Sequence, residues 1–320
     1  MLAGRITGPQ QLEFIDLPIP QAGESQVVVK LEVGSICGSD LPYFLLDKAH
    51  PSVAKEELPL RAKLSLHELV GTIHQSRSPR FKEGDRVLAV PVNFEGLAEY
   101  FVANDSGAVP LPSGPAEELV LSQPLGTVVS AYFKLTNTSH KTAVVLGQGP
   151  IGQLFCALLR HHGFAQVIAI DCLRERLKLS AWMGATHQLS GTGDEVKTAV
   201  SEITNGQGAE IVIEAAGKEE SLNLSAALLA KGGQVVVFGL PCRHYYNLAI
   251  NEFFYKEAVI INSCGPDPQV HFPIAIDLIA RRIIDVSPLI THRFGLIKTQ
   301  EAMRLFANRS DGVSKIILQA

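Results

Sequence analysis

The chain has 320 residues, enough for two domains of ordinary size, each with its own hydrophobic core. Hydrophobic residues make up 46% of the chain and charged residues 19%, which excludes a disordered protein. The formal net charge of −4 excludes the basic surface that nucleic acid or an anionic membrane would attract.

Two features of the sequence predict the compartment. The apolar runs are well short of the roughly 20 residues that a membrane helix needs, and residues 1–10 lack the apolar core of a signal peptide. The cysteines are widely spaced, with no CxxC pair, which is typical of a reducing cytosol. We therefore expect a cytoplasmic protein with free thiols at Cys37, Cys156, Cys172, Cys242 and Cys264.

The first part of the chain, to about residue 112, predicts a β-rich domain. Short alternating runs are separated by Gly and Pro, which favours a β-barrel or a sandwich. The predicted strands are residues 26–34, 69–76, 84–92 and 97–104. A proline-rich hinge follows at residues 109–118.

From Thr142 the pattern changes to apolar strands that alternate with amphipathic helices. This alternation predicts a parallel sheet covered by helices on both faces. The predicted strands are residues 142–147, 166–171, 209–217 and 234–240, and the predicted helices are residues 150–162, 174–185, 194–206 and 221–233. After Pro266 the sequence predicts helices at 273–282 and 299–309 and a last strand at 314–320.

A glycine-rich loop joins the first strand of that sheet to its helix. Gly147, Gly149 and Gly152 form a GxGxxG pattern, with Pro150 and Ile151 between the last two glycines. Glycines let the backbone approach a pyrophosphate, and the helix N-terminus offers free N–H groups and the positive end of a dipole. The pattern alone is weak evidence, but the strand–loop–helix context is the one that dinucleotide binding requires. We predict that this loop binds a dinucleotide.

Asp171 closes the next predicted strand and indicates which dinucleotide binds. A carboxylate at this place accepts a hydrogen bond from a ribose 2′-hydroxyl and repels a 2′-phosphate. Arg174 and Arg176 favour NADP instead, because a nearby arginine can bind that phosphate. We predict NAD as the cofactor.

Cys37, in the segment CGSD, can be a reactive thiol, a metal ligand or a small buried hydrophobic residue. His67 and Glu68 follow thirty residues later and are also zinc-ligand types. Adjacent side chains on a strand point to opposite faces, so His67 and Glu68 share a metal only if the backbone bends. Glu68 is therefore either a ligand or an exchangeable neighbour of the metal.

The motifs CGSD, HE, GDRV, LAEY, GxGxxG, GAEIVIEAAG and PLITHRF occur in this order along nearly the whole chain. Together they resemble the zinc-dependent medium-chain dehydrogenases, and most closely the polyol and threonine dehydrogenase branch. The resemblance implies a doubly wound parallel sheet of the Rossmann type inserted into a GroES-like β-barrel. The implied domains are residues 1–124 (catalytic), 125–265 (NAD-binding) and 266–320 (return to the catalytic domain).

The resemblance also implies the roles of single residues. Cys37 and His67 would hold one catalytic zinc, with Glu68 as a ligand or reserve ligand. Ser39 would hydrogen-bond the substrate hydroxyl, and Asp40 would orient His67. The implied reaction is NAD-dependent interconversion of a secondary alcohol or polyol-like substrate and its carbonyl product, in a homo-oligomer, either a dimer or a tetramer.

The chain departs from the family pattern at four places. Gln123 replaces the glutamate of the EPL segment, and its amide oxygen is a further candidate ligand. Pro42 occupies the place of a histidine that could relay a proton, and Leu66 the place of a glycine. The four-cysteine lobe is missing, so we predict no structural zinc. These departures keep two alternatives open, a zinc-free reductase of the quinone type and a nucleotide-binding protein without catalytic activity.

Overall fold

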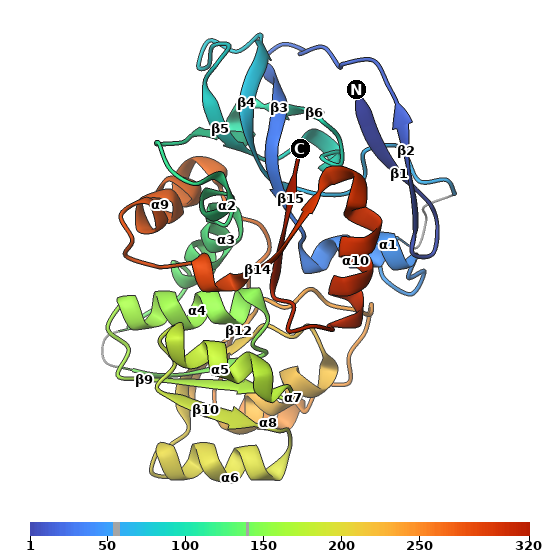
Figure 1. Cartoon of the computed structure of the whole chain (residues 1–320). Coiled ribbons are helices and arrows are strands. Elements are labelled where there is room, and N and C mark those ends of the chain that lie inside the picture. Colours follow the sequence, from blue (N-terminus) through green and yellow to red (C-terminus); the bar gives the residue numbers. More distant parts are fainter. Residues whose placement is uncertain (54–57, 139–140) are drawn as a thin grey trace. The chain divides into compact units, whose positions relative to one another are not determined.

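The computed structural model describes residues 1–53, 58–138 and 141–320 (Figure 1). These residues form two compact units. The terminal unit contains residues 1–126, 267–282 and 286–320, so both ends of the chain build it. The central unit contains residues 127–266 and 283–285. No helix in the described part of the chain is long and apolar enough to cross a membrane.

The terminal unit is built mainly of strands. Its strands are β1 (Leu2–Gly8), β2 (Gln11–Asp16), β3 (Gln26–Ser35), β4 (Glu68–Ser76), β5 (Arg86–Ala89), β6 (Tyr100–Asn104), β7 (Ala108–Pro110), β14 (Ile290–Gly295) and β15 (Lys315–Gln319). Its helices are α1 (Leu41–Leu45), α2 (Ala116–Leu119), α9 (Pro268–Ala280) and α10 (Thr299–Asn308). Helix α3 (Ser122–Tyr132) begins in this unit and continues into the central one.

Strand β3 organises the larger sheet of the terminal unit. The strand order is β14-β15-β3-β4-β5-β7, and β6 also pairs with β3. The run VVVKLEV buries Val27, Val29 and Leu31 in one core with residues of β4, β5 and β6, as an alternating strand should. Because β3 pairs antiparallel with both β4 and β15, it brings the beginning of β4 and the last strand of the chain to its own C-terminal end.

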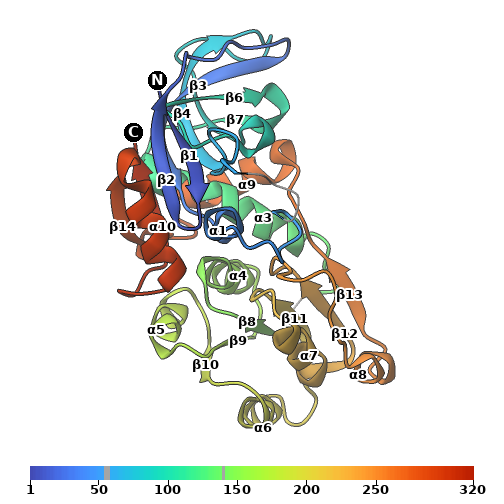
Figure 2. The same ribbon diagram turned by 90° about the vertical axis from the view of Figure 1, so that its right-hand side faces the viewer.

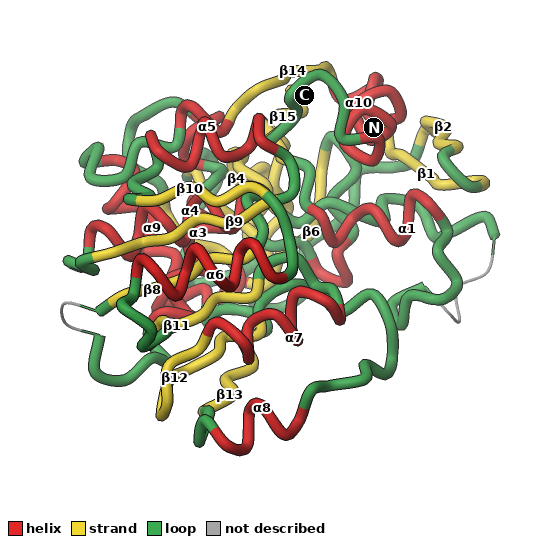
Figure 3. The backbone as a smooth tube through the Cα atoms, turned by 90° about the horizontal axis from the view of Figure 1, so that it is seen from below, coloured by secondary structure: helices red, strands yellow, loops and turns green. Residues whose placement is uncertain are grey.

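The central unit contains a parallel sheet with helices on both faces, seen from below in Figure 3. Its strands are β8 (Thr142–Leu146), β9 (Gln166–Asp171), β10 (His187–Ser190), β11 (Ala209–Glu214), β12 (Leu229–Val237) and β13 (Val259–Asn262). Its helices are α4 (Pro150–His161), α5 (Arg174–Trp182), α6 (Asp194–Ile203), α7 (Glu219–Leu228) and α8 (Ile250–Tyr255).

The strand order is β10-β9-β8-β11-β12-β13. Successive strands are added first on one side of β8 and then on the other, as in doubly wound nucleotide-binding folds. Alternate apolar residues of the strands pack beneath α6, α7 and α8. The predicted doubly wound parallel sheet and the predicted β-rich domain are both confirmed.

Several predicted elements are wrong in their extent. The helix predicted at 221–233 ends at Leu228, and residues 229–233 belong to β12. Helix α9 begins at Pro268 instead of residue 273, because the Asp267 side chain accepts the Gln269 N–H and caps the helix. The prediction also missed α8 and β13, which lie together at one edge of the central sheet (Figure 2).

Candidate functional site

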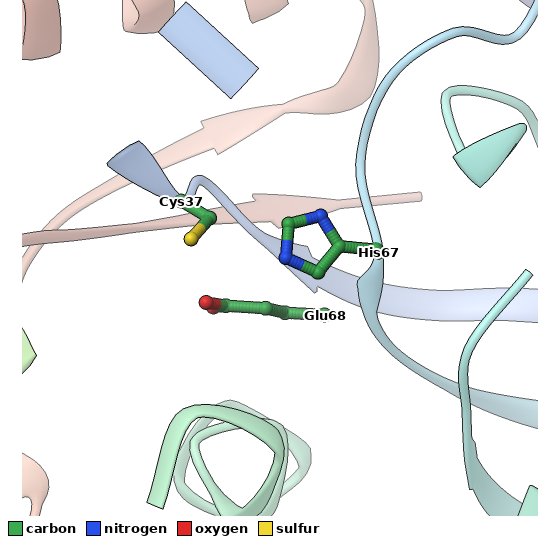
Figure 4. A group of neighbouring side chains, drawn as sticks. All are labelled: Cys37, His67 and Glu68. Carbon is green, nitrogen blue, oxygen red and sulfur yellow. The ribbon is translucent and has the colours of Figure 1, made fainter. Parts of the chain in front are cut away.

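Three zinc-ligand side chains converge where β3 ends and β4 begins. Cys37 follows β3 by two residues, His67 immediately precedes β4, and Glu68 is the first residue of β4. One ligand atom from each residue, the Cys37 sulfur among them, lies within 4.8 Å of the other two. Figure 4 shows the thiol, the carboxylate and one imidazole nitrogen directed toward a common point. The structure thus brings three of the predicted ligands together.

The carboxylate of Glu68 fits a metal ligand. Glu68 is fully buried, and its Oε2 atom accepts hydrogen bonds from Ser35 and Lys315. Its Oε1 atom is buried too and has no hydrogen-bond partner among the described residues. An unsatisfied buried acceptor is costly, and a bound cation would satisfy it. Thiolate, imidazole and carboxylate are also the ligand types that zinc takes in proteins.

Asp40 connects the two chain segments that carry these ligands. One oxygen of its buried carboxylate accepts the Cys37 N–H at 2.8 Å, and the other accepts the Leu66 N–H at 3.2 Å. The second oxygen also lies 3.6 Å from His67 Nδ1. Burial raises the pKa of Asp40, but His67 and the two N–H groups outweigh burial and lower that pKa below its ordinary value. Asp40 is therefore an ionised link between the two segments.

The surroundings of His67 favour positive charge. Burial lowers the pKa of His67, but the neighbouring Asp40 and Cys37 outweigh burial and raise that pKa well above its ordinary value. The imidazole thus lies between two groups that are negative when ionised. Such a field suits a cation bound at this cluster.

Leu66 provides the backbone bend that lets His67 and Glu68 face the same point. Its φ of +71° lies in the left-handed region, which is strained for a residue with a branched side chain. Its side chain is fully buried in the core of the terminal unit, and its N–H is held by Asp40. Packing and this hydrogen bond together hold the strained conformation.

The glycine-rich loop of the central unit has the backbone that a dinucleotide requires. Gly147 has a φ of +90°, and a Cβ on Gly152 would lie 1.9 Å from the Gly147 carbonyl oxygen. Gly149 precedes α4 without a side-chain cap, and a Cβ built on it meets no atom within 4 Å. With Pro150 as its first residue, the 12-residue helix α4 presents uncapped N–H groups beside an open glycine. The loop fits a pyrophosphate.

Asp171, at the end of β9, is tied into the same loop. Its carboxylate accepts the Gln148 N–H at 2.7 Å and the Leu173 N–H at 2.8 Å, and Arg176 lies 3.6 Å from it. These contacts fix a negative charge directly beside the glycines. The carboxylate also pairs with Arg176, one of the two arginines that could otherwise bind a 2′-phosphate.

Comparison with protein families gives matches on both units. Residues 23–113 match the alcohol dehydrogenase GroES-like domain, and residues 150–281 match the zinc-binding dehydrogenase domain. The chain belongs to the zinc-dependent alcohol dehydrogenase family. It is a medium-chain dehydrogenase of the alcohol and polyol type, as its sequence motifs predicted.

Individual relatives of this dehydrogenase match over almost their whole length. An L-threonine 3-dehydrogenase of Bacillus licheniformis is 28% identical, with 97% of this chain and 96% of the relative covered. The sorbitol dehydrogenase of Homo sapiens is 26% identical, with 94% and 91% covered. The crystal structure of 2R,3R-butanediol dehydrogenase from Bacillus subtilis has a TM-score of 0.85 at 21% identity, with 100% and 99% covered.

The other predicted residues of the dehydrogenase lie as follows. Ser39 is half-buried in the turn after Cys37, and Gln123 is buried at the beginning of α3. Pro42 lies buried in the first turn of α1. Gln123 stays a predicted ligand, and Ser39 a predicted contact of the substrate.

Sequence reasoning missed three residues beside the cluster. The rings of Phe94 and His67 form a T-shaped pair with 5.5 Å between their centroids. Ser35 and Lys315 hold Glu68. A lysine that opens a strand of the pattern KIILQ is usually exposed, so only the pairing of β15 with β3 could have identified Lys315.

Substituting Leu66 tests whether its backbone is strained. Both Leu66→Gly and Leu66→Ala lose a buried side chain and should lower the free energy of unfolding by about 2–5 kcal/mol. Glycine normally destabilises a protein relative to alanine, but at a φ of +71° only alanine keeps the strain of about 1 kcal/mol. We expect the glycine variant to be the more stable of the two in urea unfolding. Equal stability, or a more stable alanine variant, would show that this backbone is not strained.

Proposed function

We propose that this protein is an NAD-dependent dehydrogenase that oxidises a secondary alcohol or polyol-like substrate, or reduces the corresponding carbonyl compound, with one zinc ion at Cys37, His67 and Glu68. The observation that carries the proposal is the convergence of a thiol, an imidazole and a carboxylate within 4.8 Å. One oxygen of that buried carboxylate has no hydrogen-bond partner among the described residues. A bound zinc ion would supply Lewis acidity to the substrate hydroxyl, and a bound nicotinamide would take the hydride. Gln123 is a further candidate ligand.

The residues of the chain have separate tasks in this reaction. Oxidation removes a hydride from the carbinol carbon and a proton from its hydroxyl group. Ser39, two residues after Cys37, has a half-buried hydroxyl that would accept a hydrogen bond from the substrate hydroxyl and relay the proton, passing its own proton on to water as it takes that of the substrate. Asp40 keeps the ligand segments together and orients His67 through Nδ1.

Secondary alcohols are the preferred substrate class for two reasons. L-Threonine 3-dehydrogenase and 2R,3R-butanediol dehydrogenase are named for substrates whose hydroxyl group is on a secondary carbon. In this chain Phe94, half-exposed beside His67, offers an apolar surface for the second carbon substituent of such a substrate.

We also propose a cytoplasmic homo-oligomer. The cysteines form no disulfide, as in a reducing compartment. Strand β13 is an edge strand whose outer side is unpaired among the described residues (Figure 2). Val259 and Ile260 on this strand are 50% and 42% exposed, and an open apolar edge of this kind is suited to pairing with a second copy.

The zinc part of the proposal is tested by Cys37→Ala. Replacing even an outer-shell partner of a metal costs 10–100-fold, so losing the thiolate should lower the rate of alcohol oxidation by more than about 100-fold. NADH binding, measured by fluorescence, should change little, because the glycine-rich loop belongs to the other unit. Elemental analysis should show loss of zinc in this variant but not in the control Cys264→Ala, whose thiol is exposed. Full activity of Cys37→Ala would instead favour a zinc-free reductase.

The cofactor part is tested by Asp171→Asn. Asparagine keeps an oxygen that can accept the Gln148 N–H but removes the negative charge that would repel a 2′-phosphate. Calorimetric dissociation constants for NADH and NADPH should therefore approach each other by roughly tenfold, or about 1.4 kcal/mol. The proposal fails if the wild-type protein binds NADPH more tightly than NADH.

A further inference from the structure

A lysine from the last strand of the chain is buried beside the candidate metal ligands. The side chain of Lys315 is 3% exposed and that of Glu68 is fully buried, and Lys315 Nζ lies 2.5 Å from Glu68 Oε2. Burying a charged pair is costly and does not by itself stabilise a fold. The position of this pair at the metal cluster therefore requires an explanation other than stability.

The contacts of Lys315 are those of an ammonium group. Its Nζ atom donates to Glu68 Oε2, to the Ser35 hydroxyl and to the Ile36 carbonyl, the last two at 3.2 Å. An ammonium group has three donors and no acceptor, so these three acceptors use it completely. Ser35 in turn donates to the same Glu68 oxygen. One oxygen of the carboxylate is thus held by two donors, while Oε1 has no partner in the part of the chain that the structure describes.

The strand register explains why these groups meet. Ser35 lies opposite Glu68 on one side of β3 and opposite Ile317 on the other. The Ile36 N–H continues the pairing with β15 by donating to the Ile316 carbonyl. Lys315, at the beginning of β15, therefore lies next to the segment in which β3 passes into Cys37.

We propose that Lys315 is a positioning residue that makes Glu68 an electrically neutral unit at the metal site. The lysine fixes one carboxylate oxygen, aims the other at the cluster and cancels its charge. His67 and the candidate ligand Gln123 are neutral as ligands, so among the candidate ligands the Cys37 thiolate carries the uncompensated negative charge, while the ionised Asp40 adds a second one beside His67. This inference rests on the proposed function, since it assumes that the cluster binds zinc.

The proposal predicts that zinc affinity follows the net charge of the pair. Lys315→Met leaves the pair at −1 and should lower the dissociation constant for Zn²⁺ by about tenfold or more. Glu68→Gln leaves it at +1 and should raise that constant by a similar factor. The double variant Glu68→Gln, Lys315→Met is neutral again and should bind Zn²⁺ about tenfold or more tightly than Glu68→Gln alone.

The experiment measures Zn²⁺ binding to the full-length, metal-depleted proteins by competition with a chromophoric chelator. Lys231→Met is the matched control, because it breaks an exposed pair with Glu257 and removes the same charge from the chain. Its affinity should equal that of the wild type. The free energy of unfolding of each metal-depleted protein, measured in urea, separates effects on folding from effects on binding.

Two results would overturn the proposal. If both single substitutions weaken zinc binding, Lys315 and Glu68 serve only as scaffold. If the double variant binds as poorly as Glu68→Gln, the charge of Lys315 has no influence on the metal; this comparison also decides the matter if Lys315→Met does not fold. A wild-type protein that binds no Zn²⁺ would instead refute the proposed metal site itself.

Discussion

The site depends on the register of β3 against its two neighbours. Ser35 at the end of β3 lies opposite Glu68 of β4 and opposite Ile317 of β15. The thiol of Cys37 follows two residues later, so the same register places it beside the carboxylate. A slip of one residue in either pairing would turn Glu68 or Lys315 to the other face of the sheet and dismantle the cluster. Residues from three distant parts of the sequence meet because β3 pairs on both sides.

The charges around the cluster determine that it favours a cation. A region that favours positive charge is formed by Glu68, the ionised Asp40 and the thiol of Cys37. One oxygen of Glu68 has no hydrogen-bond partner among the described residues. Lys315, paired with Glu68, opposes that field. The left-handed backbone of Leu66 has an energetic cost, and its buried side chain and the Asp40 hydrogen bond offset that cost. Strain and buried charge are thus concentrated where the ligands lie.

Much of this arrangement could be predicted from the sequence, because it depends on the order of short motifs and on the alternation of apolar and polar residues. The alternation of strands and helices and the context of the glycines identified the central sheet, and the motif order identified Cys37, His67 and Glu68 as candidate ligands. Lys315 and Ser35 could not be identified in this way. They contact Glu68 only because distant strands pair with each other. Ser35 and Lys315 themselves are 280 residues apart in the sequence. Strand β13 was not predicted, because its apolar residues are largely exposed and do not show the alternation of a half-buried strand.

The central claim is that one zinc ion is bound by a single thiolate together with nitrogen and oxygen ligands. X-ray absorption at the zinc edge measures this most directly, because sulfur and the lighter ligands lie at different distances, about 2.3 Å and about 2.0–2.2 Å from the metal. The account predicts one sulfur per zinc in the metal-replete wild-type protein. A spectrum with no sulfur, or with two or more sulfur atoms per zinc, would contradict it.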